Sequence, residues 1–130
     1  MTSKMTPGDL RRFILPSMPR ISPDGSQVVF VHQRQDGPKK CMSLWTVPAD
    51  GSAPARAFTR GRNDSEPQFS PDGCTVAFIG GEKEEAPQVY LIPTAGGESF
   101  PLTTLPEGRI HSLVFAPDGQ SIAFSFRAQD

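Results

Sequence analysis

The sequence predicts an all-β fold: an incomplete β-propeller of about two and a half four-stranded antiparallel blades with a short N-terminal helix. The first observation is a turn motif, Ser-Pro-Asp-Gly or Ala-Pro-Asp-Gly, that occurs three times, each time before a short apolar run. The second is its spacing, because the prolines of the motif lie 48 residues (23 to 71) and 46 residues (71 to 117) apart. A repeat of this size with four strands in each period is typical of propeller blades.

The motif itself predicts a tight hairpin. Proline pre-sets φ for the second turn position, aspartate can bond the backbone, and glycine takes the left-handed conformation that follows. A turn of this kind joins two antiparallel strands through a bulge. In residues 76–79 the strand after the turn is apolar on both faces, and residues 28–31 follow the same pattern. We therefore expect these strands to be covered by a neighbouring sheet on each side.

Residues 1–18 are expected to form a helix and a linker. Thr6 can cap a helix over residues 6–15, with Pro7 in its first turn. Leu10 and its apolar neighbours at helical spacing would form one stripe that docks on the propeller. Two prolines, Pro16 and Pro19, would end this helix.

Residues 19–130 are expected to form the partial propeller, in three repeat units. The first unit, residues 19–62, follows its hairpin with a polar loop (33–40), a third strand (43–48) and a fourth strand (55–59). The second unit, residues 63–106, repeats this order with a loop (80–87), a third strand (88–93) and a fourth strand (99–103). The third unit, residues 107–130, holds only two strands and is incomplete.

Composition excludes several classes of function. The 130 residues carry a net charge of −1 and no long basic run, which gives little support to nucleic-acid binding. No apolar stretch is long enough for a membrane span or a secretory signal, so we expect a cytoplasmic protein. In that compartment Cys41 and Cys74 would stay reduced.

Five segments carry a resemblance to a known family. The chain resembles the start of a peptidase of the prolyl oligopeptidase family, above all its acylaminoacyl-peptidase and dipeptidyl-peptidase-like branch. The segments are residues 19–25, 44–51, 67–73, 96–103 and 115–119, and the predicted N-terminal helix adds to them.

The resemblance implies an N-terminal propeller followed by a C-terminal α/β-hydrolase domain with a Ser-Asp-His triad. The propeller of such enzymes admits peptides and excludes folded proteins, so the implied partners are peptide substrates and the hydrolase domain. We expect the present chain to stop before that domain. No position here matches the family's catalytic motif, so the chain is expected to be inactive alone and to need no cofactor.

A search for catalytic or metal-binding patterns gives no candidate site. Residues 97–101 approach the Gly-x-Ser-x-Gly nucleophile elbow but lack its last glycine and its strand-turn-helix context. His32 and His111 each lack a recognisable partner, and with Cys41 and Cys74 they have no zinc-like spacing. We predict no catalytic, cofactor-binding or metal-binding residue.

The recurrent aspartates of the turn motif could suggest calcium. Turn chemistry explains them, and no Asp-x-Asp-x-Asp ladder follows. They are Asp24, Asp72 and Asp118.

Two other functions remain open on the sequence. The chain could be a non-enzymatic, TolB-like propeller that binds a protein partner, or several copies could assemble into a closed ring. The end blades would expose apolar faces and unpaired strand edges, which favour self-association.

Overall fold

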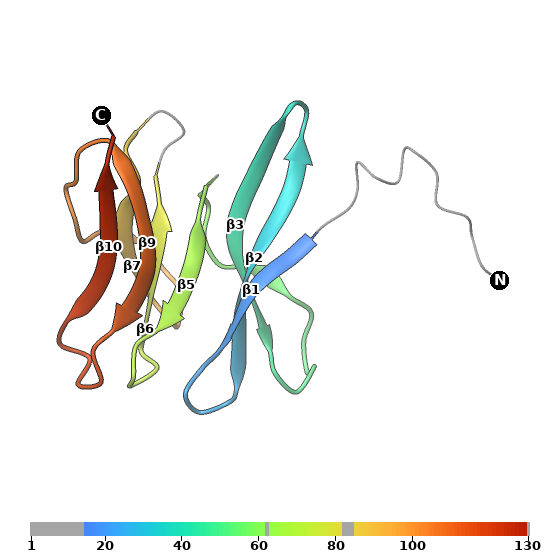
Figure 1. The fold of residues 1–130 in the computed structure, drawn as a ribbon. Coiled ribbons are helices and arrows are strands. Elements are labelled where there is room, and N and C mark those ends of the chain that lie inside the picture. Colours follow the sequence, from blue (N-terminus) through green and yellow to red (C-terminus); the bar gives the residue numbers. More distant parts are fainter. Residues whose placement is uncertain (1–14, 62, 82–84, 130) are drawn as a thin grey trace.

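Strands are the only regular secondary structure in the described part of the chain, which comprises residues 15–61, 63–81 and 85–129 of a computed structural model. They form three antiparallel sheets that follow one another along the chain (Figure 1). Within these ranges no helix has the length and apolar character needed to cross a membrane. The predicted all-β fold with four-stranded antiparallel units is confirmed.

Each sheet is built from strands that are consecutive in sequence. The first sheet has the order β1 (Leu15–Ile21), β2 (Gln27–Asp36), β3 (Lys39–Pro48), β4 (Arg56–Ala57). The second has the same order with β5 (Ser65–Phe69), β6 (Thr75–Gly80), β7 (Gln88–Pro93), β8 (Phe100–Pro101). The third contains β9 (Gly108–Phe115) and β10 (Ile122–Ala128). We call the three sheets the first, second and third blade.

The predicted N-terminal helix is not supported. The helix was predicted over residues 6–15. Residues 6–14 lie outside the described residues, and Leu15 is the first residue of strand β1. Residues 16–18, predicted as part of a linker, belong to this strand, and Pro16 pairs with His32 of β2. Strand β1 is an edge strand of its sheet, where proline is tolerated because no neighbour needs its missing N–H group.

The polar loop predicted over residues 33–40 is also wrong. Strands β2 and β3 continue as a ribbon in which Asp36 pairs with Lys39, so that only a two-residue turn is left. Gly37 has a φ of 62° there, in the left-handed region. The sequence did not indicate these strands because their side chains are mostly polar. An exposed ribbon of this kind shows no alternation of apolar and polar residues. The fourth strands are shorter than predicted, since only two residues of each pair with the third strand.

The three hairpin turns have the predicted geometry. Gly25, Gly73 and Gly119 have φ values of 76°, 76° and 73°. In the second turn the Gly73 amide donates to the Ser70 carbonyl at 2.8 Å, and the other two turns repeat this bond. The prediction of a turn that ends on a left-handed glycine is confirmed.

Replacing Gly73 by alanine is expected to lower the free energy of unfolding by about 1–2 kcal/mol, because alanine is strained at positive φ. The added Cβ would lie 3.5 Å from Pro23, an ordinary contact, so the loss would come from the backbone. Chemical denaturation measures it. Gly73→Asn is the matched control, since asparagine tolerates this region, and an equal loss in both variants would contradict the explanation.

The middle blade is covered on both faces. Val76 and Phe78 of β6 pack with residues of the first blade, in a cluster that includes Val29, Val31 and Leu44. On the opposite face, Ala77 and Ile79 pack with Ile110 and Leu113 of the third blade. These four residues of β6 are at most 7% exposed. The expectation of a strand buried on both sides is therefore confirmed for residues 76–79.

The same expectation for residues 28–31 is only half right. Val29 and Val31 face the second blade and are each 1% exposed. Val28 and Phe30 point to the other side and are only half-buried. No described sheet lies on that side of the first blade (Figure 1).

A left-handed residue that is not glycine interrupts the first strand of every blade. Met18, Glu66 and Ser112 have φ values of 49°, 50° and 59°, and the strand pairing shifts register at each of them. They occupy equivalent repeat positions, 48 residues (18 to 66) and 46 residues (66 to 112) apart, as the turn prolines do. The residue after the bulge is buried in the second and third blades, as Pro67 and Leu113. The bulge thus turns one more side chain towards the preceding blade.

Candidate functional site

The structure does not bring together the residues that sequence patterns singled out for chemistry. His32 lies in β2 of the first blade and His111 in β9 of the third, with the second blade between them. Ser99, the near match to a nucleophile, is exposed just before β8. In the part of the chain that the structure describes, no three His, Cys, Asp or Glu side chains are grouped to hold a metal ion.

The turn aspartates bond within their own turns. Ser22 donates its hydroxyl to Asp24 at 2.6 Å, and the Ser26 amide donates to the same oxygen at 2.9 Å. These bonds lower the pKa of Asp24 to about 2, with the Ser22 hydroxyl as the largest cause. Asp72 accepts the same pair of bonds from Ser70 and Cys74, and its pKa is lowered too. The carboxylates stabilise the hairpin turns by accepting these hydrogen bonds, as the turn motif predicts.

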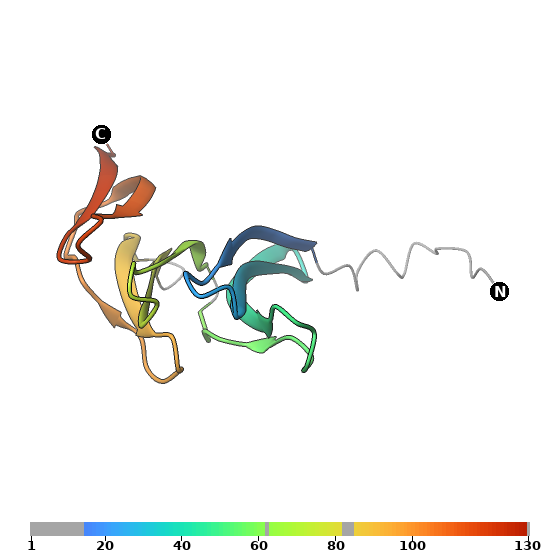
Figure 2. The ribbon, with the colours of Figure 1, turned by 90° about the horizontal axis from the view of Figure 1, so that it is seen from below.

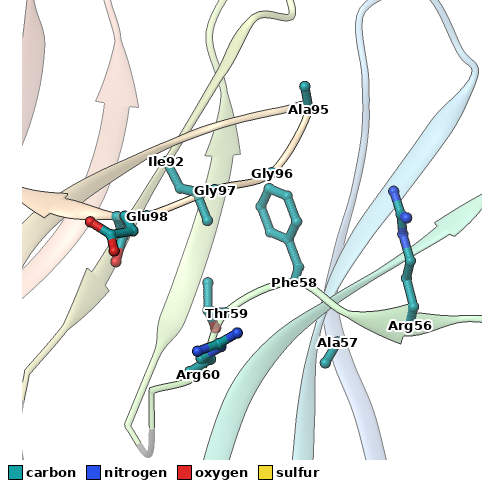
Figure 3. A pocket seen from close by; sticks show the side chains of 11 residues that line it. Arg56, Ala57, Phe58, Thr59, Arg60, Ile92, Ala95, Gly96, Gly97 and Glu98 are labelled. Carbon is teal, nitrogen blue, oxygen red and sulfur yellow. The ribbon is translucent and has the colours of Figure 1, made fainter.

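A cleft with a volume of about 750 Å³ lies between the first and second blades. One wall is the segment that follows β4, residues 56–60, and the other is the turn between β7 and β8, residues 95–99. The Phe58 ring points from the first wall towards Gly96 of the second (Figure 3). Gly96 and Gly97 both have positive φ, and because they carry no side chain the backbone of this wall is open to the cleft at these two positions.

The cleft carries charge that no described residue neutralises. Arg56 and Arg60 lie on the first wall, exposed, and neither guanidinium group has an ion-pair or hydrogen-bond partner among the described residues. Glu98 is the only acid on the opposite wall, and Phe58 and Ile92 supply apolar contact. Guanidinium groups beside apolar side chains are suited to binding an extended chain that carries a carboxylate.

A smaller hollow of about 290 Å³ continues from this cleft to a buried carboxylate. Asp64, just before β5, is 4% exposed and accepts a hydrogen bond from the Thr59 hydroxyl at 2.7 Å. Thr59 in turn accepts a bond from the Leu44 amide at 2.9 Å. Burial is the largest influence on Asp64 and raises its pKa, while the bonds from Thr59 and the Gly61 backbone oppose it. This network joins the end of the first blade to the start of the second.

The second blade repeats the network with a different acceptor. The Thr103 hydroxyl accepts a bond from the Val89 amide at 3.0 Å and donates to the Gln88 amide oxygen at 2.6 Å. Gln88 also bonds both backbone groups of Leu105. The two threonines lie 44 residues apart (59 to 103), a repeat spacing that indicates equivalent positions but that did not by itself predict this hydrogen-bonding role. No sequence pattern signalled Asp64, or Arg56 and Arg60, because their setting depends on the neighbouring blade.

Comparison with known proteins gives both a family and relatives. The family model described as the TolB beta propeller domain (PD40) matches residues 14–130. The uncharacterized peptidase YuxL of Bacillus subtilis is 32% identical over an alignment of 127 residues, which covers 94% of this chain and 19% of YuxL. The chain thus spans about a fifth of that relative.

Solved structures show the same fold. Puromycin hydrolase superposes with a TM-score of 0.69 at 21% identity, over 87% of this chain and 20% of its own. The acylaminoacyl peptidase of Pyrococcus horikoshii gives a TM-score of 0.67 at 19% identity, over 87% of this chain and 17% of its own. At these identities the similarity concerns the architecture of stacked blades.

Proposed function

Because the chain belongs to the TolB beta-propeller family, we propose that it is the non-catalytic, substrate-gating part of a serine-type oligopeptidase or acylaminoacyl peptidase. The observation that carries the proposal is the 32% identity to a peptidase over almost the whole chain. In this role the blades would wall an opening through which peptides pass, while the catalytic residues lie in a separate α/β-hydrolase domain.

The arrangement of the inner strands supports a gating role. Strands β1, β5 and β9 lie side by side on one side of the fan of sheets, and β4 and β8 lie on the opposite side (Figure 2). In a closed propeller the inner strands surround a central channel. The left-handed residues Met18, Glu66 and Ser112 are all on these strands and are exposed or half-buried. They would place one side chain from each blade at the channel.

The proposed role implies particular partners and a cellular location. Its partners would be peptide substrates and the hydrolase domain, and it would work in the cytoplasm. Cys41 and Cys74 are not joined by a disulfide, which is compatible with a reducing compartment.

The purified chain is expected to show no turnover of acyl-peptide or peptidyl-anilide substrates above the buffer rate, because the proposed catalytic groups lie elsewhere. The reading frame after codon 130 should encode an α/β-hydrolase. The joined protein should then cleave short peptides and spare folded ones, and the hydrolase domain alone should lose this discrimination. Turnover by the chain itself, or a joined protein that cleaves folded substrates equally well, would refute the proposal.

A second candidate function is a TolB-like, non-enzymatic propeller that binds a protein partner. The cleft with Arg56 and Arg60 favours it, because two guanidinium groups that no described residue neutralises suit an acidic segment. A labelled glutamate-rich peptide, followed by fluorescence anisotropy, distinguishes the two functions. Binding that is lost in the Arg56→Gln, Arg60→Gln double variant would support the second.

A further inference from the structure

The cleft between the first and second blades presents several hydrogen-bond donors that no described residue uses. On the first wall these are the guanidinium groups of Arg56 and Arg60. On the opposite wall the backbone amides of residues 97–99 donate no hydrogen bond to a described residue. Among the described residues that line the cleft, Glu98 carries the one carboxylate. The cleft therefore suits a ligand that is rich in carboxylate and carbonyl oxygens.

Phe58 gives the first wall an apolar centre. It lies midway between the two arginines in sequence, is half-buried, and packs against the core that the first two blades share. Its ring points across the cleft towards Gly96 of the other wall (Figure 3). The core contact holds this ring in place, whereas both arginine side chains are exposed. Along residues 56–60 the wall thus offers a cation, an apolar surface and a second cation, in that order.

The backbone of the same wall is open to a partner strand. Strand β4 is an edge strand of the first blade, so it pairs with β3 on one side only. Beyond β4 the Phe58 and Thr59 amides both donate to the Leu44 carbonyl of β3, at 2.9 and 3.1 Å, which keeps this segment beside the sheet. An edge strand of this kind can accept an extended peptide as a further strand.

The architecture of a blade does not require the two arginines. The second blade repeats this segment 44 residues later, as residues 100–104, with the same backbone hydrogen bond to its own third strand. The equivalents of Arg56 and Arg60 are Phe100 and Thr104, and neither is charged. A blade therefore folds without charge at these positions, so the guanidinium groups are not needed to build it.

The cleft is formed by two consecutive blades. Every described residue that lines it lies between positions 56 and 99, so both walls belong to the first and second blades. It is on the side of β4 and β8, opposite the inner strands β1, β5 and β9 (Figure 2). A ligand in this cleft would therefore not block an opening between the inner strands.

We propose that this cleft binds an extended peptide segment in which one apolar residue lies between two acidic residues. The two carboxylates pair with Arg56 and Arg60 through charge-assisted hydrogen bonds, and the apolar side chain packs on Phe58. Backbone oxygens of the segment accept hydrogen bonds from the amides of residues 97–99. The inference rests on the second candidate function, the binding of a protein partner, and names the chemistry of that partner.

Two peptides of the same composition test the order of the groups. Glu-Ser-Leu-Ser-Glu should bind about tenfold more tightly than Leu-Ser-Ser-Glu-Glu, because only the first pairs with both arginines while its leucine contacts Phe58. Both peptides are capped at their ends and labelled, and fluorescence anisotropy measures the two dissociation constants. Equal constants would overturn the inference but leave the binding of acidic partners standing. Binding of neither peptide would overturn both, and the peptidase proposal would still be tested by activity.

Neutral variants test the role of each arginine. Arg56→Gln and Arg60→Gln should each weaken binding of the first peptide about tenfold, because each removes one charge-assisted pair. Arg20→Gln is the matched control, since Arg20 is exposed on β1, away from the cleft, and its guanidinium donates to the adjacent Pro19 carbonyl. It removes the same charge and should bind as the wild type does. An equal loss in Arg20→Gln would overturn the inference, because net charge alone would then govern binding.

Charge reversal tests which arginine meets which end of the segment. Arg56→Glu should prefer one of the two peptides Lys-Ser-Leu-Ser-Glu and Glu-Ser-Leu-Ser-Lys, and Arg60→Glu should prefer the other. The pairing of variant with peptide gives the direction of the bound segment. Both positions are exposed, so each variant should unfold at the wild-type temperature. The same preference in both variants, or no preference in either, would overturn the inference.

Single-stranded DNA is the competing class of ligand, because arginines beside an aromatic ring also suit phosphates and bases. Glu98 in the cleft and the net charge of −1 oppose a chain of phosphates. A labelled oligothymidine should therefore bind more weakly than Glu-Ser-Leu-Ser-Glu. Tighter binding of the oligonucleotide, lost in the two arginine variants, would overturn the peptide as the ligand.

Discussion

Replacing Phe78 by alanine is expected to lower the free energy of unfolding by about 3–5 kcal/mol, the largest effect of any single substitution proposed for this chain. Phe78 is 2% exposed, belongs to the core between the first two blades, and stacks on Tyr90 with ring centroids 5.5 Å apart. Small domains are stable by only about 5–15 kcal/mol in total. The variant should therefore be largely unfolded at mild denaturant concentrations, as circular dichroism in urea would show.

Phe100→Ala is the control for this substitution. The same atoms are removed, but Phe100 is 51% exposed on β8, so the loss should stay below about 1 kcal/mol. Equal losses in the two variants would mean that the first two blades do not share a core.

Replacing Asp64 by alanine is expected to cost about 2–3 kcal/mol at pH 7. The substitution leaves the buried Thr59 hydroxyl without its acceptor and removes the bond from the Gly61 backbone. Asp64→Asn keeps one acceptor oxygen for Thr59 and should lose less. Thermal or urea denaturation of the three proteins measures the difference, and an alanine variant as stable as the wild type would contradict the role of Asp64 in joining the blades.

The pH dependence of stability gives this prediction a second readout. Burial raises the pKa of Asp64 above its ordinary value of 3.8, so the folded state binds the proton more tightly than the unfolded state does. The proton-linked part of the contribution of Asp64 adds to that of its hydrogen bonds; it is fully present below pH 3.8 and is lost as pH rises through the folded-state pKa. Acidification from neutral pH should therefore widen the gap between the wild type and Asp64→Ala.

The turn aspartates titrate in the opposite sense. Hydrogen bonds, above all from Ser22, lower the pKa of Asp24 to about 2, so its contribution is present above pH 3.8 and is lost as pH falls through about 2. Asp50 and Asp72 have lowered pKa values as well, chiefly through side-chain bonds from Ser52 and Ser70. Strong acid should therefore destabilise the hairpins even though it neutralises Asp64.

Much of the fold could be predicted from local patterns. The turn motif predicted the hairpins, and the left-handed φ of Gly25, Gly73 and Gly119 confirms it. The doubly apolar run at residues 76–79 predicted a blade covered on both sides, which the two core clusters confirm. The predicted kinship with peptidase propellers is confirmed by the match to the propeller family and by the related peptidase.

The strands that were missed had weak or misleading local signals. The ribbon around Gly37 is polar, so nothing in the sequence distinguished it from a loop. Strand β1 contains two prolines, which indicated the end of a helix but also suit an edge strand. At Val28 and Phe30 the apolar pattern was correct, but burial depends on whether a neighbouring sheet is present.

The sequence by itself determined the repeat, the turn chemistry and which side chains are apolar, because these depend on residues close together along the chain. Only the tertiary structure decided that Asp64 bonds Thr59, that two arginines line a cleft between blades, and that the buried His32 ring has no hydrogen-bond partner among the described residues. The physical reason is that each of these properties depends on contacts between elements distant in sequence. Burial and hydrogen bonding in a stack of sheets depend on the adjacent sheet, and a periodic sequence does not specify which of its faces are covered.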